Sequence, residues 1–370
     1  MIRKDTAVSI WLIIGLVMVY FQIIIGGVTR LTGSGLSITK WEIVTGTFPP
    51  LSEDAWIEEF DEYKKTPQYE KINEGMELGD HVFQVGTFKF IYFWEYFHRL
   101  WARNMGFVFL FPFLFFLYKK KLTKQLNFDL LKVVGLAGLA AVFGWIMVAS
   151  GLVNRPWVNA YKLSIHLSIG ISVFMMLWWA FLSFRNGGRI NRRSDRITRA
   201  TAYFILLVCL QIFFGGIMSG MKASLIYPTW PDIGGQMIPS EIVKGANWSI
   251  DSFINYDTGS FTFALMHFIH RGLAYLIVLG FAFYWWRYRK HLGKSTLSSF
   301  WLFGGLILVQ ICLGIITLLE SIGHIPVLWG VLHQGVGVLV LVSLFYHYYC
   351  LLYTSPSPRD RTRSRMPSSA

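Results

Sequence analysis

Residues Ile91 to Gly106 read IYFWEYFHRLWARNMG and place several ionisable side chains at the head of a long apolar run. Glu95 and His98 are three positions apart, so on a helix they lie one turn apart on the same side. Ionisable groups are costly inside a bilayer, and a membrane helix that keeps them usually uses them. The stretch therefore predicts a membrane helix with a functional face.

The second half of the chain repeats this stretch. Residues 263–275 read FALMHFIHRGLAY, in which His270 corresponds to His98 and His267 takes the place of Glu95. Two more pairs of segments match. QIIIGG at 22–27 resembles QIFFGG at 211–216, and KLSIHLSIG at 162–170 resembles WGVLHQGVG at 329–337. The sequence thus consists of two copies of one frame.

The composition is typical of a polytopic membrane protein. Of 370 residues, 54% are hydrophobic and only 15% are charged, and the mean hydropathy is +0.46. The net charge of +13 comes from short basic clusters between apolar runs. Such clusters indicate orientation signals and contacts with anionic membrane lipid, not nucleic-acid binding. Cys209, Cys312 and Cys350 show no CxxC spacing, so neither a disulfide framework nor a zinc site is predicted.

Eight apolar runs are long enough to cross about 30 Å of hydrocarbon. They are Ala7–Val28, Ile91–Leu117, Leu130–Leu152, Tyr161–Phe184, Thr201–Ile217, Phe261–Trp286, Phe300–Leu319 and Val327–Leu352. The basic clusters all fall on one side of these runs, and by the positive-inside rule both termini are cytoplasmic. Each copy holds four runs, an even number, so the two copies share one orientation.

The predicted fold is an all-α integral membrane protein of eight transmembrane helices, arranged as two pseudo-symmetric four-helix bundles. The N-terminal half comprises residues 1–185 and the C-terminal half residues 186–353. Residues 354–370 change to a composition rich in Ser, Pro and Arg, and they are expected to be a non-native or disordered tail.

Two long connections lie on the outward side. The first, at 29–90, is acidic, and its Trp56, Phe60 and Tyr63 have the spacing of an amphipathic helix on the outer surface. The second, at 219–260, contains YPTWPDIGGQMIP, whose prolines and glycines exclude a regular helix. Both connections could cover an outward-facing site.

Four histidines lie at similar depth near the outward ends of even-numbered spans: His98, His166, His270 and His333. Helix bundles build cofactor sites from inward-projecting side chains, and imidazole is a common ligand of heme iron. One pair in each half therefore predicts two heme pockets. Any one histidine could instead hydrogen-bond a neighbouring helix. A metal without porphyrin is disfavoured, because a two-histidine site lacks the further ligands that zinc prefers.

The residues around these histidines each allow two interpretations. Arg99 and Arg271 follow candidate ligands directly and could pair with heme propionates or extend to the membrane surface. Gln22 and Gln211 are expected to form interhelical hydrogen bonds. Several glycines could admit a macrocycle or allow close helix packing. These are Gly26, Gly27, Gly170, Gly215, Gly216, Gly272, Gly335 and Gly337.

The two copies differ at Glu95 and His267. A carboxyl group in an apolar pocket can exchange protons at neutral pH. The N-terminal pocket is therefore expected to be the reaction site, and the C-terminal pocket to hold a structural or electron-transferring heme. The competing interpretation of Glu95 is an ion pair with Arg99, one turn later. His267 could be an alternative ligand or a hydrogen-bonding neighbour of the ligand His270.

Several segments together resemble the heme A synthase family, whose members are membrane enzymes of cytochrome oxidase assembly. They are GGVTRLTGSGLSITKWEIVTGTFPPL at 26–51, FKFIYFWEYFHR at 88–99, GWIMVASGL at 144–152, YPTWPDIGGQMIP at 227–239, HRGLA at 270–274 and LHQGVG at 332–337. One branch of the family carries a cysteine pair in the first outward loop. Residues 29–90 contain no cysteine, so the chain resembles the other branch.

The resemblance implies an oxidoreductase that converts the C8 methyl group of heme O to a formyl group, giving heme A. This monooxygenase-like reaction uses successive oxygen-dependent hydroxylations and loss of water. The resemblance also implies that His98 and His166 are ligands of the substrate heme, that Glu95 is needed for turnover, and that His270 and His333 bind heme b.

The expected partners are heme O and membrane lipid. The farnesyltransferase that makes heme O and cytochrome oxidase assembly factors are possible protein partners, and the electron donor is left open. No nucleic acid is expected. The expected location is the bacterial plasma (inner) membrane, because no Arg/Ser-rich presequence precedes the first span.

Two other classes of protein remain as alternatives. A di-heme electron-transfer cytochrome that leaves its heme unmodified would share these helices and ligands. Such carriers tend to stack hemes toward opposite faces, however, and Glu95 would then have no evident role. A transporter with parallel repeats would need helices broken near the membrane midplane.

Overall fold

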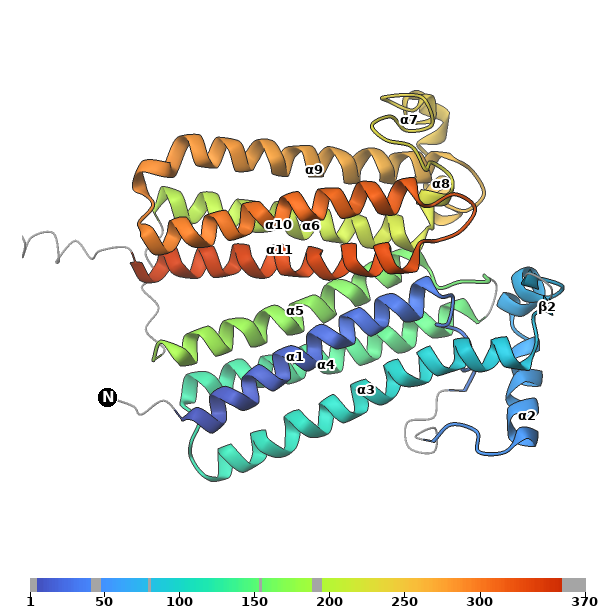
Figure 1. Cartoon of the computed structure of the whole chain (residues 1–370), viewed down its shortest axis with the longest axis horizontal. Coiled ribbons are helices and arrows are strands. Elements are labelled where there is room, and N and C mark those ends of the chain that lie inside the picture. Colours follow the sequence, from blue (N-terminus) through green and yellow to red (C-terminus); the bar gives the residue numbers. More distant parts are fainter. Residues whose placement is uncertain (1–4, 41–47, 79–80, 153–154, 188–194, 355–370) are drawn as a thin grey trace, which may run out of the picture.

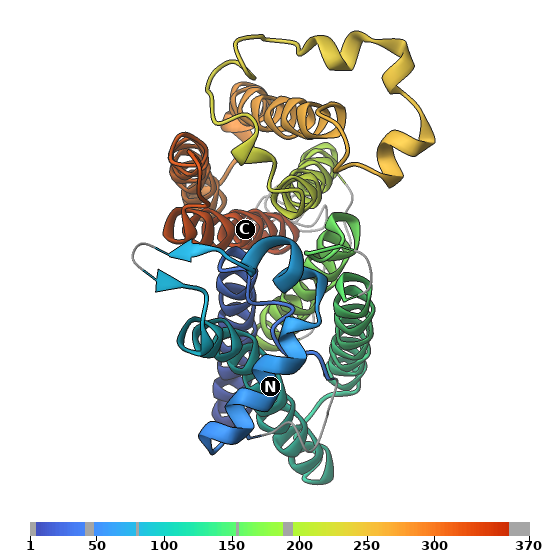
Figure 2. The same ribbon diagram turned by 90° about the vertical axis from the view of Figure 1, so that its right-hand side faces the viewer.

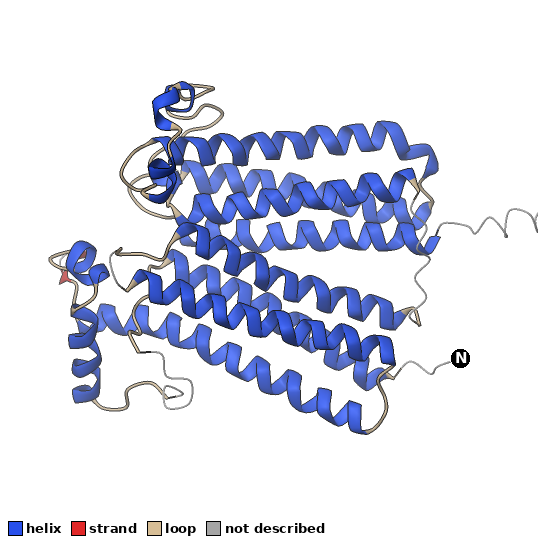
Figure 3. Cartoon of the chain, turned by 180° about the vertical axis from the view of Figure 1, so that it is seen from behind, coloured by secondary structure: helices blue, strands red, loops and turns tan. Residues whose placement is uncertain are grey.

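The computed structural model describes residues 5–40, 48–78, 81–152, 155–187 and 195–354. Residues 355–370 of the expected tail lie outside the described residues, and Thr354, which was expected to belong to the tail, ends the last helix. Helices form nearly all of the regular structure (Figure 3). The α-helices are α1 Thr6–Leu31, α2 Glu53–Lys64, α3 Val85–Tyr118, α4 Lys124–Gly151, α5 Ala160–Arg185, α6 Arg196–Gly220, α7 Ser240–Val243, α8 Ile250–Ile254, α9 Phe261–Tyr288, α10 Lys294–Leu319 and α11 Val327–Thr354. The shorter elements are η2 Tyr69–Asn73, η3 Ala223–Leu225, η4 Gly245–Asn247, η5 Arg289–His291, and the antiparallel strands β1 Glu77–Leu78 and β2 His81–Val82.

Within the described ranges, eight helices are long and apolar enough to cross a membrane, which confirms the predicted number of spans. They are α1, α3, α4, α5, α6, α9, α10 and α11. α3 continues through Pro112 as a single helix. None of the eight is broken within its described length, so the feature that a transporter with parallel repeats would need is missing there.

Several helices begin earlier than the apolar runs predict. α4 begins at Lys124 because the Thr123 hydroxyl caps it by accepting a hydrogen bond from the Leu126 N–H at 3.2 Å. α6 begins at Arg196, where Asp195 and Thr198 form a reciprocal capping box. Hydropathy marks only the part of a helix that lies in hydrocarbon, whereas the backbone hydrogen bonds continue into the polar flanks.

The spanning helices form two groups, one of α1, α3, α4 and α5 and the other of α6, α9, α10 and α11 (Figure 1). Equivalent helices make equivalent contacts. α1 packs on α3 as α6 packs on α9, and α4 packs on α5 as α10 packs on α11. Between the groups, α1 packs on α11 and α5 packs on α6. These pairings are consistent with the two predicted pseudo-symmetric halves.

The two groups share one apolar core. Leu12 of α1, Leu177 of α5, Val208 of α6 and Leu341 of α11 are all at most 2% exposed and belong to one continuous cluster. The core therefore runs across the boundary between the halves and holds their helices in a fixed arrangement.

The long loops gather at one end of the molecule, and α1 begins and α11 ends at the other (Figure 1). Seen from the loop end, α2 crosses the N-terminal group, and the segment with α7 and α8 lies beside the C-terminal group (Figure 2). The predicted amphipathic helix is confirmed as α2. Its Phe60 and Tyr63 are buried, and its Trp56 ring contacts Tyr92 of α3 at 4.9 Å. Residues 227–239 contain no regular helix, as predicted.

Candidate functional site

The four candidate ligand histidines lie on four different helices that all begin at the loop end. His98 is on α3, His166 on α5, His270 on α9 and His333 on α11, and each lies in the first half of its helix. All four side chains are partly buried. The structure therefore places them at the same end of the bundle.

Each histidine ring rests against a glycine of a neighbouring helix. A Cβ atom added to Gly215 of α6 would lie only 2.8 Å from Cε1 of His270, so a side chain there would displace the ring. A glycine faces the ring in all four cases, although His98 turns Nε2 toward its glycine and the other three rings turn Cε1. The pairs are Gly26 and His98 (3.1 Å to Nε2), Gly144 and His166 (3.0 Å to Cε1), Gly215 and His270 (2.8 Å to Cε1), and Gly314 and His333 (2.9 Å to Cε1).

Three of these rings also meet a glutamine that stands one turn before the glycine. The amide Nε2 lies 2.9 Å from His98 Nε2 for Gln22, 3.2 Å from His270 Nε2 for Gln211, and 3.3 Å from His333 Nε2 for Gln310. The expected interhelical hydrogen bonds of Gln22 and Gln211 are thereby confirmed, and both go to candidate ligands.

Sequence reasoning missed three residues of this arrangement, namely Gln310, Gly144 and Gly314. The signal that could have found Gln310 and Gly314 is the spacing Gln-x-x-x-Gly, which occurs in α1, α6 and α10. This spacing does not identify Gly144, because residue 140, four positions earlier, is an alanine and not a glutamine.

The residues of the C-terminal pair fit a heme. The ring centroids of His270 and His333 are 6.5 Å apart, and the ring planes are inclined by 69°. Nδ1 of each ring is buried and has no hydrogen-bond partner in the described structure. A buried polar atom without a partner is costly. Two neighbouring imidazoles, each with an unused nitrogen, are a donor set that suits heme iron.

The N-terminal pair has related features. Nδ1 of His166 is again buried without a partner among the described residues. Gly170 lies one turn after His166, and no atom lies within 4 Å of a Cβ added there. An unused nitrogen beside such open space also fits a bulky metal-bound ligand.

The paired glycines divide between two roles. Gly26 and Gly215 face histidine rings, as described above. Gly27 and Gly216 instead let helices of opposite halves approach closely. A Cβ added to Gly27 would lie 2.9 Å from Gln334 Nε2 of α11, and one added to Gly216 would lie 2.7 Å from Ser164 Oγ of α5. Close packing therefore accounts for the second glycine of each pair.

Glu95 lies in a polar pocket, so the expectation of an apolar pocket is wrong. Its side chain is buried, with 3% of the residue exposed, and its carboxylate accepts three hydrogen bonds. Oε2 accepts from Ser37 Oγ and from the Ile38 N–H, both at 2.8 Å, and Oε1 accepts from Arg99 Nη2 at 2.5 Å. The predicted ion pair with Arg99 is thus present. These donors hold the carboxylate in a fixed orientation.

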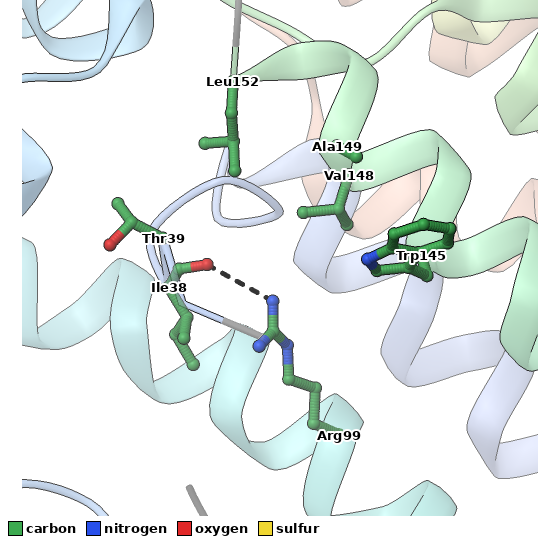
Figure 4. Close-up of a pocket in the computed structure, with 7 residues that line it drawn as sticks. All are labelled: Ile38, Thr39, Arg99, Trp145, Val148, Ala149 and Leu152. Atoms are coloured by element: carbon green, nitrogen blue, oxygen red, sulfur yellow. Dashed lines mark hydrogen bonds between the residues drawn. The ribbon is translucent and has the colours of Figure 1, made fainter. Parts of the chain in front are cut away.

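Arg99 connects this carboxylate to the first outer loop. Its guanidinium donates to the carbonyl oxygens of Ile38 and Lys40, both at 3.3 Å. Figure 4 shows the side chain reaching from α3 toward the loop segment that carries Ile38. A cavity of about 170 Å³ lies beside it and extends to Trp145 of α4, the residue after the glycine that seats His166. The cavity therefore lies between the first outer loop, α3 and α4.

His267 and Arg271 repeat this arrangement in the C-terminal half. Arg271 Nη1 donates to the carbonyl oxygen of Asp232 in the second outer loop at 2.5 Å, and Nη2 lies 3.1 Å from His267 Nδ1. His267 is fully buried, and its Nε2 donates to the Ala223 carbonyl oxygen at 2.9 Å. Because an arginine only donates, this ring is neutral and both of its nitrogens are occupied. That arrangement favours the hydrogen-bonding interpretation of His267.

The second outer loop is ordered by its own hydrogen bonds. The Gly235 N–H donates to Asp232 Oδ1 at 2.7 Å, and this bond, together with one from the Thr229 side chain, lowers the pKa of Asp232. The Gly234 N–H donates to Thr229 Oγ1 at 2.9 Å. The Asp232 carbonyl that Arg271 contacts therefore sits in a defined turn, not in a freely moving chain.

Fold and site together define a polytopic helical membrane protein with two histidine pairs suited to heme. A family model described as cytochrome oxidase assembly protein matches residues 9–345. Similar relatives are heme A synthases of three bacteria. That of Flavobacterium johnsoniae is 34% identical over 93% of this chain and 97% of the relative, that of Parvibaculum lavamentivorans is 36% identical over 93% and 94%, and that of Bradyrhizobium diazoefficiens is 37% identical over 90% and 89%. This chain belongs to the heme A synthase family.

Proposed function

We propose that this protein is a heme A synthase, which oxidises the C8 methyl group of heme O to a formyl group. The reaction proceeds by two oxygen-dependent hydroxylations at one carbon, followed by loss of water. The family membership supports the activity, and the two histidine pairs support the binding of two hemes. The N-terminal half, residues 1–185, then holds the substrate, and the C-terminal half, residues 186–353, holds heme b.

The residues of the N-terminal half have distinct roles in this proposal. His98 and His166 bind the iron of heme O and keep the macrocycle in place. Glu95 is the acid–base residue. Loss of water from a twice-hydroxylated carbon requires that one oxygen lose a proton and the other gain one, and a fixed carboxylate can carry that proton. Arg99 orients the carboxylate and complements the charge of a heme propionate.

The C-terminal half supplies a permanent cofactor. His270 and His333 would hold heme b, which supplies electron transfer when bound. Arg271 fixes the second outer loop and complements a propionate there, as Arg99 does in the other half. The neutral His267 in the place of Glu95 leaves this half without a buried carboxylate at the corresponding position, which fits a cofactor that is not itself modified.

The observation that carries the proposal is the buried Glu95 carboxylate, one helical turn from His98 and held by three donors. A di-heme electron-transfer cytochrome would need both histidine pairs but no such group. Only the N-terminal half has such a carboxylate. The equivalent residue of the C-terminal half is His267, and both of its ring nitrogens already form hydrogen bonds.

Extraction of the hemes from purified protein, produced with a source of heme O, tests the proposal. Reversed-phase chromatography should find heme A or a hydroxylated intermediate in the wild type and accumulated heme O in Glu95→Gln. His267→Gln is the matched control, because it alters the equivalent place in the other half and should still yield heme A. Heme b alone in all three samples, despite available heme O, would favour the electron-transfer cytochrome.

We also propose that the protein lies in a bacterial inner membrane with both termini cytoplasmic, and that it receives heme O from the farnesyltransferase that makes it. The clusters of Lys and Arg at the end opposite the long loops support this orientation. A fluorescent protein fused after α11 should fluoresce if that end is cytoplasmic. Alkaline phosphatase fused at the same place should then be inactive.

A further inference from the structure

Each of the four histidine rings rests against a glycine of a neighbouring helix, and these four seats differ in the residue that stands one turn before the glycine. In three of them a glutamine stands one turn before the glycine that supports the ring, and in the fourth an alanine does. The four pairs are Gln22 and Gly26, Gln211 and Gly215, Gln310 and Gly314, and Ala140 and Gly144. The exception belongs to His166, in the half proposed to bind the substrate.

The three glutamines are suited to hold a metal-bound imidazole. Each amide nitrogen contacts a ring nitrogen, and each amide oxygen is buried without a partner in the described structure. A ligating histidine keeps one N–H, which nearly always donates to an outer acceptor. Rotation of the glutamine amide brings its free oxygen to that N–H.

His166 lacks the glutamine. Its ring lies near the backbone carbonyl of Ala140, just as His270 and His333 lie near the carbonyls of Gln211 and Gln310. The backbone environment is therefore the same, and only the side chain differs. Among the described residues no side-chain hydrogen bond to the His166 ring is found, whereas a glutamine amide contacts each of the other three rings.

We propose that His166 is the exchangeable ligand of the N-terminal heme, whereas the glutamine-held His98, His270 and His333 are permanent ligands. The proposal rests on the proposed function, since it takes this pair to bind a heme that enters as substrate and leaves as product. Outer hydrogen bonds orient a ligand and raise its basicity, and their loss typically weakens metal binding about 10- to 100-fold. A substrate heme requires one ligand that releases, and a permanent cofactor does not.

The test installs the missing glutamine. Carbon monoxide binds to ferrous heme where a ligand yields its place, so its binding rate reports ligand exchange without reference to turnover. The reduced, heme-loaded wild type should bind carbon monoxide at one heme. Ala140→Gln should slow this binding by about tenfold or more. Ala140→Met adds a side chain of similar length without an amide, and it should bind carbon monoxide like the wild type.

The mirror variant makes the C-terminal pair resemble the N-terminal one. Gln310→Ala should allow carbon monoxide to bind at a second heme. The proposal is overturned if Ala140→Gln, with normal heme content, binds carbon monoxide as fast as the wild type, or if Ala140→Met slows the binding equally. It is also overturned if the wild type binds none. Heme extracts of the same samples separate this result from the proposed function, which fails when they contain heme b alone.

Discussion

The Glu95 carboxylate and the Arg99 guanidinium form a 2.5 Å ion pair one turn apart on α3, and only 4% and 14% of the two side chains are exposed. The same guanidinium bonds two carbonyl oxygens of the first outer loop. The pair therefore links the helix that carries His98 to the loop above it. In the C-terminal half, His267 and Arg271 make the corresponding link without a negative charge.

Removal of Arg99 should be costly, because it leaves a buried carboxylate without its cation. We expect Arg99→Gln to lower the free energy of unfolding by about 3–5 kcal/mol. Glu95→Gln combined with Arg99→Gln should recover part of this loss. Lys89→Gln is the control, because it breaks an ion pair with Glu53 whose side chains are 34% and 77% exposed, and it should cost under about 1 kcal/mol. Thermal unfolding in detergent compares the stability of the wild type with that of the three variants. Equal losses of stability in Arg99→Gln and Lys89→Gln would contradict a special cost of leaving the Glu95 carboxylate unpaired.

Substitution of His270 or His333, the proposed ligands of heme b, should affect heme binding differently from substitution of the buried His267. His270→Ala and His333→Ala should each lose most of the heme of the C-terminal half, because neither ring has a substitute nearby. His267→Gln should retain it, because that ring hydrogen-bonds Arg271 and Ala223 and has no free nitrogen. The pyridine hemochrome content per protein gives the measurement. Heme loss in His267→Gln equal to that in His270→Ala would assign His267 a direct role.

Alanine substitutions at three glycines should have graded effects on heme content and stability, according to what the added Cβ atom would meet. Gly215→Ala should displace His270 and reduce the heme content, since the added Cβ would lie 2.8 Å from the ring. Gly272→Ala has no atom within 4 Å of the added Cβ, so it should be harmless unless a bound macrocycle occupies that space. Gly305→Ala in α10 also meets nothing, and it should stabilise the helix by up to about 1 kcal/mol. Heme content and thermal stability of the three variants, compared together, check each expectation.

A second buried polar cluster lies at the other end of the C-terminal half. Tyr284 Oη lies 3.0 Å from both His347 Nε2 and Thr201 Oγ1, and Ser299 Oγ lies 2.9 Å from His347 Nδ1. These bonds join α6, α9, α10 and α11. Tyr284→Phe would leave buried partners unsatisfied, and we expect a loss of about 1–3 kcal/mol in unfolding free energy without loss of heme. A spectrum altered as strongly as that of His270→Ala would contradict this structural role.

Much of the fold could be predicted because its determinants are local. The length and hydropathy of the apolar runs are enough to find all eight spans, and the spacing of Trp56, Phe60 and Tyr63 is enough to find α2. Helix ends could not be placed in this way. They depend on caps such as Asp195 and Thr123, which lie outside the apolar runs.

The part of the candidate site that could be predicted consists of residues whose type alone is unusual within a membrane span. The histidines stand out because ionisable groups are rare within spans, and their repetition pairs them. The surroundings of Glu95 could not be predicted, because Ser37 and Ile38 lie 58 and 57 positions away along the chain. Gln310 was overlooked because one glutamine in a span signals little until the structure places it on a histidine ring.

The apolar core shared by α1, α5, α6 and α11 limits how the chain can be divided. Cutting the connection between α5 and α6 would yield two fragments, each with four spanning helices and one histidine pair. Each fragment alone would expose to lipid the face on which Gly27 or Gly216 closely approaches the other half. We therefore expect the fragments to reassociate when they are made together, and a separated half to lose the positions of its histidines.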